Sequence, residues 1–338
     1  MKFPNIYPDP ECRRLRGMLS DYVGVPAENL LVGCGADELI DLLMRCVLDP
    51  GDTIVDTPPT FTMYAFDADV NAARTVQVPR LEGFKLDIDG ICEAVIENDA
   101  KIVFVTSPNN PDGRATSARM DQSHAELRIH DHVYNWPSFV TAHTSPSSSD
   151  WPLRNAVMIF SLSKLTGHAG TRFGWALVAK FDVAKAMATH VWLKSGGPPG
   201  VESQMRAASI IRRVTQSVGT SNDFFEWVHT EMSNRYTVLE SIFEGQQKFA
   251  LLSERGSACA WLRCPPHGDT CANRLRKVGI VSAEGENFGA DSAHARVCVA
   301  SHRSSFDIVA RRLDMLVRQE QDREYERWQC PDCPFNFD

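Results

Sequence analysis

The amino-acid sequence predicts an α/β protein with a mainly parallel sheet in a larger domain, followed by a smaller α+β domain. Over the first two thirds of the chain, apolar β-rich segments alternate with segments whose apolar residues recur at helical spacing. Several strand candidates are apolar on both faces, which is typical of a parallel sheet buried between helices. From about residue 201 the pattern is mostly helical, with short apolar segments between the helices.

The elements follow from these patterns in chain order. Apolar residues at positions 36, 39, 40, 43 and 47 predict a helix over 36–48. Strands of the larger domain are expected at 30–34, 52–57, 101–106, 127–134, 156–162 and 172–179. Beyond them we expect helices at 224–249, at 269–277 and from 306 onward, and strands at 259–264, 279–284 and 295–300. The predicted domains are 25–245 and 1–24 plus 246–320, with an irregular C-terminal extension at 321–338.

Composition excludes several classes of partner for this 338-residue chain. The net charge is -8 and the basic residues are scattered, so no nucleic acid is expected. No apolar run approaches the roughly 18 residues that span a bilayer, so no membrane span is expected. The 10 cysteines are irregularly placed, which favours free thiols in a reducing compartment. Cys330 and Cys333 form a lone Cys-x-x-Cys pair without the second pair that a zinc site needs, so no metal is expected.

A Gly/Thr/Ser loop after an apolar strand candidate contains the first chemical candidate, Lys164. Its amine can form an imine with an aldehyde cofactor if a cation or partial desolvation keeps some of it neutral. Arg172, eight residues later, would supply that cation and bind a phosphate, and Ser161 adds a hydroxyl donor. An ordinary exposed loop lysine is the plain alternative.

Asp131 lies in a strand candidate that is otherwise rich in apolar residues, where a carboxylate requires a cation or hydrogen-bond donors. A protonated pyridine nitrogen would meet that requirement and would keep the ring an electron sink. Tyr134 and Asn110 could bind a phenolic oxygen of the same ring. A strand-end cap for Asp131 and simple turn chemistry for Asn110 remain the alternatives.

Two glycines between a strand candidate and a helix start expose the amides of Ala36 and Asp37, which favours an anion. A tight turn is the plain alternative for the two glycines. Phe61 would stack on a planar cofactor or pack in the core. Arg296 lies in an apolar strand candidate, where its fork would bind a substrate carboxylate or an internal acid. Together these groups match the needs of one common cofactor, pyridoxal 5′-phosphate.

The order and spacing of these residues resemble the fold type I enzymes that depend on pyridoxal 5′-phosphate, the aspartate aminotransferase superfamily. The resemblance covers about residues 3–317 and implies a seven-stranded-type sheet in a three-layer α/β/α large domain. It implies that Lys164 carries the cofactor, that Asp131 pairs with the ring nitrogen and that Arg296 binds the substrate carboxylate. The other implied cofactor contacts are Tyr134 and Asn110 at the ring oxygen, Phe61 on the ring, and Ser161, Arg172, Ala36 and Asp37 at the phosphate.

Different parts of the chain resemble different subfamilies. The first 113 residues are similar to histidinol-phosphate aminotransferase, which implies a homodimer with Tyr7 reaching the neighbouring cofactor phosphate. The remainder is similar to the alliinase and tryptophan–pyruvate aminotransferase family. Ser282 and Ala283 stand near the place where histidinol-phosphate enzymes carry an arginine for the substrate phosphate. The chain begins at its Tyr-Pro-Asp-Pro motif, so we expect the family's N-terminal arm to be lacking.

The resemblance implies an aminotransferase that moves the amino group of an L-amino acid, aromatic or otherwise hydrophobic, to a 2-oxo acid. Lys164, once displaced by the substrate amine, would remove the α-proton as a general base. Three alternatives stay open: a carbon–sulfur lyase that expels a β-leaving group, transamination of histidinol phosphate, and a catalytically silent binding subunit. The expected compartment is the cytoplasm, or an organelle if an upstream transit segment is missing from the sequence.

Overall fold

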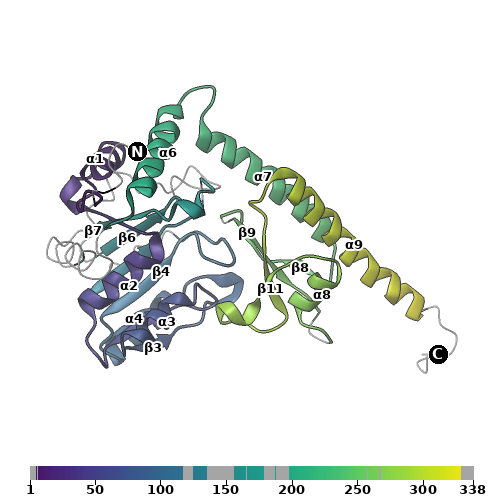
Figure 1. Cartoon of the computed structure of the whole chain (residues 1–338). Helices are drawn as coiled ribbons and strands as arrows, with labels where there is room; N and C mark the ends of the chain where they lie inside the picture. Colours follow the sequence, from purple (N-terminus) through teal and green to yellow (C-terminus); the bar gives the residue numbers. More distant parts are fainter. Residues whose placement is uncertain are drawn as a thin grey trace.

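The computed structural model describes residues 5, 7–116, 125–134, 156–164, 166–178, 187, 198–256, 258–265 and 268–328, with side chains to residue 319. A larger unit surrounds a seven-stranded sheet and a smaller one surrounds a four-stranded sheet (Figure 1). Helices α7 (Phe224–Phe243) and α9 (Arg303–Trp328) run along the smaller unit. Within these residues, no helix combines the length and apolar character needed to cross a membrane.

The larger sheet has the strand order β1-β7-β6-β5-β4-β2-β3. Pairs among β2, β3, β4, β5 and β6 are parallel, whereas β7 runs antiparallel to both of its neighbours. The predicted α/β class with a mainly parallel sheet is therefore confirmed. The strands are β1 (Leu30–Gly33), β2 (Thr53–Asp56), β3 (Arg74–Gln77), β4 (Ile102–Thr106), β5 (Leu127–Asp131), β6 (Ala156–Ser161) and β7 (Gly174–Val178).

Helix α2 (Ala36–Val47) covers one face of this sheet with an apolar stripe. In this helix, Leu39, Ile40 and Leu43 are fully buried, and the helix packs on β1, β6 and β7. The other helices of this unit are α1 (Arg13–Val23), α3 (Met63–Val70), α4 (Ile88–Glu97) and α6 (Val201–Ser217). Short 3-10 turns occupy Ala27–Asn29, Glu82–Phe84 and Ala169–Thr171 here and Gly285–Phe288 in the smaller unit.

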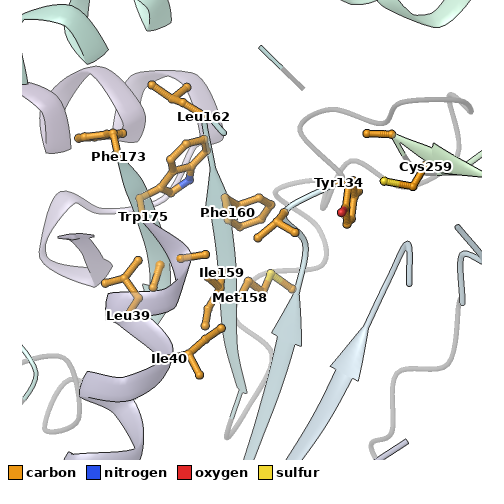
Figure 2. Close-up of a cluster of buried hydrophobic side chains, with 14 of the residues drawn as sticks. Leu39, Ile40, Tyr134, Met158, Ile159, Phe160, Leu162, Phe173, Trp175 and Cys259 are labelled. Carbon is orange, nitrogen blue, oxygen red and sulfur yellow. The ribbon is translucent and has the colours of Figure 1, made fainter. Parts of the chain in front are cut away.

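The core beside the carboxyl end of β6 is aromatic. Phe160 of β6 stacks on Trp175 of β7 with ring centroids 5.5 Å apart, and Leu39 and Ile40 of α2 lie on the same cluster (Figure 2). Burial of each such side chain contributes about 1.5–3 kcal/mol to folding. This packing fixes the strand ends from which the polar loops of the larger unit emerge.

Some element boundaries differ from the prediction. β3, with only one apolar residue in Arg-Thr-Val-Gln, is an edge strand with no buried residue and was not predicted. β5 ends at Asp131 rather than at 134. Helix α7 ends at Phe243 rather than 249, because Gly245 adopts a left-handed φ of 73°.

The smaller sheet has the order β10-β11-β9-β8 and all its pairs are antiparallel. Its strands are β8 (Ala250–Leu251), β9 (Cys259–Arg263), β10 (Ala283–Glu284) and β11 (His294–Cys298), and α8 (Cys271–Lys277) packs on β11. Helix α9 continues to Trp328, so an irregular extension from 321 was wrong for 321–328. Cys330 and Cys333 lie outside the described residues.

The cysteines correct one expectation. Cys264 and Cys271 are joined by a disulfide, whereas the irregular spacing favoured free thiols throughout. The pairing arises because the end of β9 and the start of α8 are brought together by the loop between them. Cys12, Cys34, Cys46, Cys92, Cys259 and Cys298 are reduced.

Candidate active site

A pocket of about 110 Å³ lies at the carboxyl ends of the parallel strands, the edge where α/β sheets bind ligands. Most of the residues singled out in the sequence line it: Ala36, Asp37, Phe61, Asn110, Asp131, Tyr134, Ser161, Lys164 and Arg172. Thr106, Val133, Ser163 and Ala169 complete the lining and were not predicted. Segments far apart in the sequence thus converge on one cavity.

Asp131 ends β5 as a buried carboxyl, 2% exposed, at the inner wall of the pocket. Its Oδ2 accepts a hydrogen bond from the Tyr64 hydroxyl (2.5 Å) and its Oδ1 accepts one from the Val133 amide (3.0 Å). Burial raises the pKa of Asp131, while these bonds and the positive charge of Lys164 lower it. The carboxyl is held in a fixed orientation and would be stabilised as a carboxylate by a further cation.

Tyr64 is the functional candidate that the sequence analysis missed. Its hydroxyl bonds Asp131 and also Thr106 Oγ1 (2.9 Å), and its ring stacks on Phe104 at 4.2 Å between centroids. Phe61 lies just before α3 and Tyr64 lies in its first turn, so the two side chains are neighbours. The two rings meet edge to face, 5.5 Å apart.

Lys164 lies just beyond the end of β6, with its Nζ 5.8 Å from the centroid of the Tyr134 ring. A neutral amine at Lys164 requires partial desolvation or a nearby cation, and Lys164 is exposed. Arg172, from the same connection between β6 and β7, lines the same pocket and is the nearby cation. Tyr134 is itself buried, and burial raises the pKa of its hydroxyl.

The other end of the pocket is formed by the start of α2. Gly35 has a φ of 100°, a conformation that favours glycine, and a Cβ there would lie 2.6 Å from the Arg172 guanidinium. Arg172 Nη2 pairs with Asp37 Oδ2 at 3.4 Å, and both side chains are about half exposed. The Asp37 side chain, rather than only its predicted backbone amide, thus faces the cation.

Two serines connect this end to the sheet. The Ser161 hydroxyl donates to Ser163 Oγ (2.8 Å) and accepts from the Ser163 amide (3.0 Å), which fixes the loop immediately before Lys164. A Cβ on Gly174 would lie 2.6–2.9 Å from backbone atoms of Gly35 and Ala36. Glycine at 174 therefore lets β7 approach the turn that begins α2, so the hydroxyls, Arg172 and the first amides of α2 gather around one small space.

Arg296 of β11, in the smaller unit, contacts Asn110, one of the residues that line the pocket. Its Nη1 donates to Asn110 Oδ1 (2.7 Å), and its guanidinium lies 4.7 Å from the centroid of the Phe288 ring. Within the described residues no acid pairs with Arg296, so the internal ion pair considered from the sequence is not formed. Because Asn110 accepts through its oxygen, its amide N–H groups stay directed to other acceptors.

Tyr7 is a predicted site residue that the structure does not bring to this place. It is 82% exposed and absent from the pocket lining. Within the described part of the chain, no three His, Cys, Asp or Glu side chains gather as a metal site would require. The pocket lining instead combines one amine, one guanidinium group, two carboxyl groups of which Asp131 is buried, an amide and several hydroxyls.

The fold is that of the aminotransferases. Over 92% of this chain and 84% of the other, it superposes on an aspartate aminotransferase mutant from Thermus thermophilus with a TM-score of 0.78 at 22% identity. A histidinol-phosphate aminotransferase from Sinorhizobium meliloti, solved in complex with pyridoxal-5′-phosphate, gives a TM-score of 0.76 at 20% identity, covering 93% and 83%. At these identities the likeness establishes the fold.

The family follows from the sequence itself. The family described as Allinase matches residues 27–317, and the chain belongs to this family. It is 30% identical over 342 residues to tryptophan aminotransferase-related protein 2 of Oryza sativa subsp. japonica, covering 91% of this chain and 64% of the relative. It is 47% identical over 182 residues to the chloroplastic histidinol-phosphate aminotransferase of Nicotiana tabacum, covering 53% and 44%. The chain thus spans 44–64% of the length of these curated relatives.

Proposed function

We propose that the chain binds pyridoxal 5′-phosphate in this pocket and transfers the amino group of an L-amino acid to a 2-oxo acid. The observation that carries the proposal is that an amine, Lys164, and a buried carboxyl, Asp131, line one cavity in an aminotransferase fold. The donor set fits the cofactor, because Arg172, the serine hydroxyls and the start of α2 suit a phosphate. Asp131, buried and without an ion pair among the described residues, suits a protonated ring nitrogen.

The roles of the residues follow from their positions. Bound to Lys164, the cofactor supplies an electron sink for the charge left when a bond at the substrate Cα is broken. Asp131, oriented by Tyr64 and the Val133 amide, would hold the ring proton in place. Asn110 would donate its amide N–H to the ring oxygen, and before the substrate binds its side-chain oxygen accepts from Arg296.

Proton transfer would belong to Lys164. With the substrate bound, its neutral Nζ would act as the general base that takes the proton from the substrate Cα. Arg296 would bind the substrate carboxylate as a bidentate fork, exchanging its bond to Asn110 in part for that anion. Phe61 at the pocket wall would pack on the ring, and it is positioned by its contact with Tyr64.

The substrate is proposed at the level of an aromatic or other hydrophobic amino acid, in keeping with a relative named for tryptophan aminotransferase. A carbon–sulfur lyase is the second candidate, favoured by the match to the family described as Allinase. Histidinol phosphate is the third, favoured by identity to enzymes of that name, although Ser282 and Ala283 offer no cation for its phosphate.

Two further parts of the proposal concern assembly and compartment. We propose a homodimer in which the exposed Tyr7 reaches the phosphate end of the partner's pocket, which would explain its exposure in the single chain. The compartment is proposed as the cytoplasm or, since plant relatives are named chloroplastic, an organelle. We also propose a larger domain at 25–245 and a smaller one at 246–320, with α1 packed on β1 and α6 of the larger domain rather than on the smaller one.

The test is covalent attachment of the cofactor. The protein is incubated with pyridoxal 5′-phosphate, reduced with borohydride, digested and mapped by mass spectrometry. We expect the cofactor on Lys164, and Lys164→Ala should abolish attachment and lower kcat by about 100- to 10,000-fold. Lys85→Ala, at an exposed lysine outside the pocket, is the matched control and should behave as wild type. Attachment elsewhere, or none, would overturn the proposal in favour of a silent binding subunit.

A substrate panel separates the enzyme candidates. Tryptophan, histidinol phosphate and an S-alkyl cysteine sulfoxide are each supplied with and without a 2-oxo acid. Turnover that requires the 2-oxo acid supports transamination. Pyruvate and ammonia released without it would replace our first candidate with the lyase.

A further inference from the structure

Two cysteines lie opposite each other on neighbouring strands of the smaller sheet. Cys259 of β9 and Cys298 of β11 are direct partners in the antiparallel register. The adjacent pair is hydrogen-bonded, since the Val299 amide donates to Ala258 O (2.9 Å), and the two kinds of pair alternate along such a ladder. Cys259 and Cys298 therefore form a non-hydrogen-bonded pair, in which the Cα atoms lie about 4.5 Å apart. Disulfides span Cα separations of about 4.4–6.8 Å.

The surroundings distinguish this pair from thiols that merely fill a core. Cys259 is buried, whereas Cys298 is exposed and can meet a solute. Arg296 lies two residues before Cys298 and so points to the same face of the sheet. The Cys259 sulfur is directed toward the Tyr134 ring at the pocket wall (Figure 2).

The local charges favour reactivity at the exposed member. A hydrogen bond from Cys259, a bond from the Ala300 amide and the positive charges of Arg296 and Lys164 lower the pKa of Cys298 to about 6. The same hydrogen bond, together with burial, raises the pKa of Cys259. Cys298 is thus an accessible thiolate that can attack a disulfide, and Cys259 is a protonated thiol that can resolve the mixed disulfide. Thiol–disulfide exchange requires these two roles.

We propose that Cys259 and Cys298 are a redox-active dithiol site that forms a cross-strand disulfide beside the pocket when it meets a small-molecule disulfide. The Cys298 thiolate attacks one sulfur of oxidised glutathione, forms a mixed disulfide and expels one glutathione thiolate. Cys259 loses its proton to that thiolate and attacks Cys298, expelling the second glutathione. Two protein thiols and one oxidised glutathione become one protein disulfide and two glutathione thiols.

Oxidation would change the charge next to the proposed substrate clamp. The disulfide cannot carry the negative charge that the Cys298 thiolate places near Arg296 and Lys164. It would also tie β9 to β11 beside Tyr134 and Arg296. The site is independent of the proposed catalytic function, because it requires only the reduced cysteines and an oxidant.

Tryptic mapping gives a direct test on the whole, folded chain. Trypsin releases Cys259 in 256–263 and Cys298 in 297–303, with one cysteine in each peptide. Treatment with oxidised glutathione should join these two peptides with the loss of two hydrogen atoms, and dithiothreitol should separate them. The Cys264–Cys271 disulfide stays within a single peptide, 264–274, and cannot be confused with the cross-link.

Variants separate the two steps. In Cys259→Ser, a glutathione adduct should persist on Cys298, whereas wild type should retain none because Cys259 displaces it. Cys298→Ser should lose both adduct and cross-link, and Cys92→Ser, at a cysteine of α4, should cross-link as wild type. Circular dichroism confirms that each variant is folded. A lasting adduct on Cys298 of the wild type, or no reaction at either cysteine, would overturn the proposal.

Discussion

The two ends of the pocket are built in opposite ways. At the inner end, Asp131 is 2% exposed and its oxygens are bonded to Tyr64 and to a backbone amide. At the outer end, Arg172 and Asp37 form an ion pair whose side chains are 48% and 56% exposed. The inner end is fixed by the sheet before any ligand arrives, whereas the outer pair is weakly held and can be exchanged for an anion.

The largest effect expected at the inner end concerns Asp56, whose charge also acts on Tyr64. Burial raises the pKa of Asp56 from an ordinary 3.8 to about 6, so the folded state holds this proton more tightly than the unfolded state. Its stabilising contribution is present below about pH 4 and is lost as pH rises through about 6, an effect of about 3 kcal/mol. Urea unfolding at pH 4 and pH 7 measures the free energy of unfolding of wild type and of Asp56→Asn. Wild type should lose stability relative to Asp56→Asn as the pH rises from 4 to 7.

Asp52 provides a control of opposite sign. Its hydrogen bond from Lys101 lowers its pKa, so its contribution to stability is present at neutral pH and is lost as pH falls. Asp52→Asn should therefore lose stability relative to wild type at pH 7. A constant difference between wild type and Asp56→Asn at both pH values would contradict a buried, titrating Asp56.

Asp131→Asn tests the inner end directly. Loss of a charged partner for the ring nitrogen should weaken cofactor binding by about 1.5–3 kcal/mol, or about 10- to 100-fold. Because the ring is common to both ligands, the loss should be the same for pyridoxal 5′-phosphate and for pyridoxal in fluorescence titrations. Asp67→Asn, at a buried acid of α3 outside the pocket, should bind both as wild type does. A loss confined to the phosphorylated ligand would place the ring elsewhere.

Arg172→Ala tests the outer end and should have the smallest effect. The Arg172 side chain is half exposed and solvent screens its charge, so its contact with a phosphate should contribute about 1 kcal/mol and affinity for pyridoxal 5′-phosphate should fall about fivefold. Affinity for pyridoxal, which has no phosphate, should not change in the same titration. Equal losses for both ligands would show that Arg172 shapes the whole pocket and would remove the distinction between its two ends.

The sequence predicts the parts of this pocket that depend on strand ends. Asp131 and Lys164 follow apolar strands, and the parallel strands of one sheet end at the same edge, so their convergence could be expected. Tyr64 was missed because its partner, Asp131, is distant in sequence, and a tyrosine in a helix gives no sign of which strand end it will meet. The exposure of Lys164 was likewise set by loop placement, which no periodicity encodes.

The edge strand β3 and the disulfide were difficult to predict from the sequence for a related reason. β3 was missed because an edge strand buries too little to need apolar residues, and its pairing with β2 is decided by the backbone. The disulfide between Cys264 and Cys271 depends on a turn geometry that irregular cysteine spacing does not reveal. Apolar periodicity reports burial, so features held by backbone pairing or by tertiary proximity escape it.

The antiparallel strand β7 has a consequence for how the pocket comes together. Parallel neighbours need long crossovers, but β6 and β7 are joined directly by the connection that holds both Lys164 and Arg172. Closing so short a loop costs little chain entropy, so these two cations can take their relative positions before distant segments arrive. An insertion in this connection would displace both together. Lys164 and Arg172, the proposed cofactor lysine and phosphate ligand, thus lie on one contiguous segment of the chain.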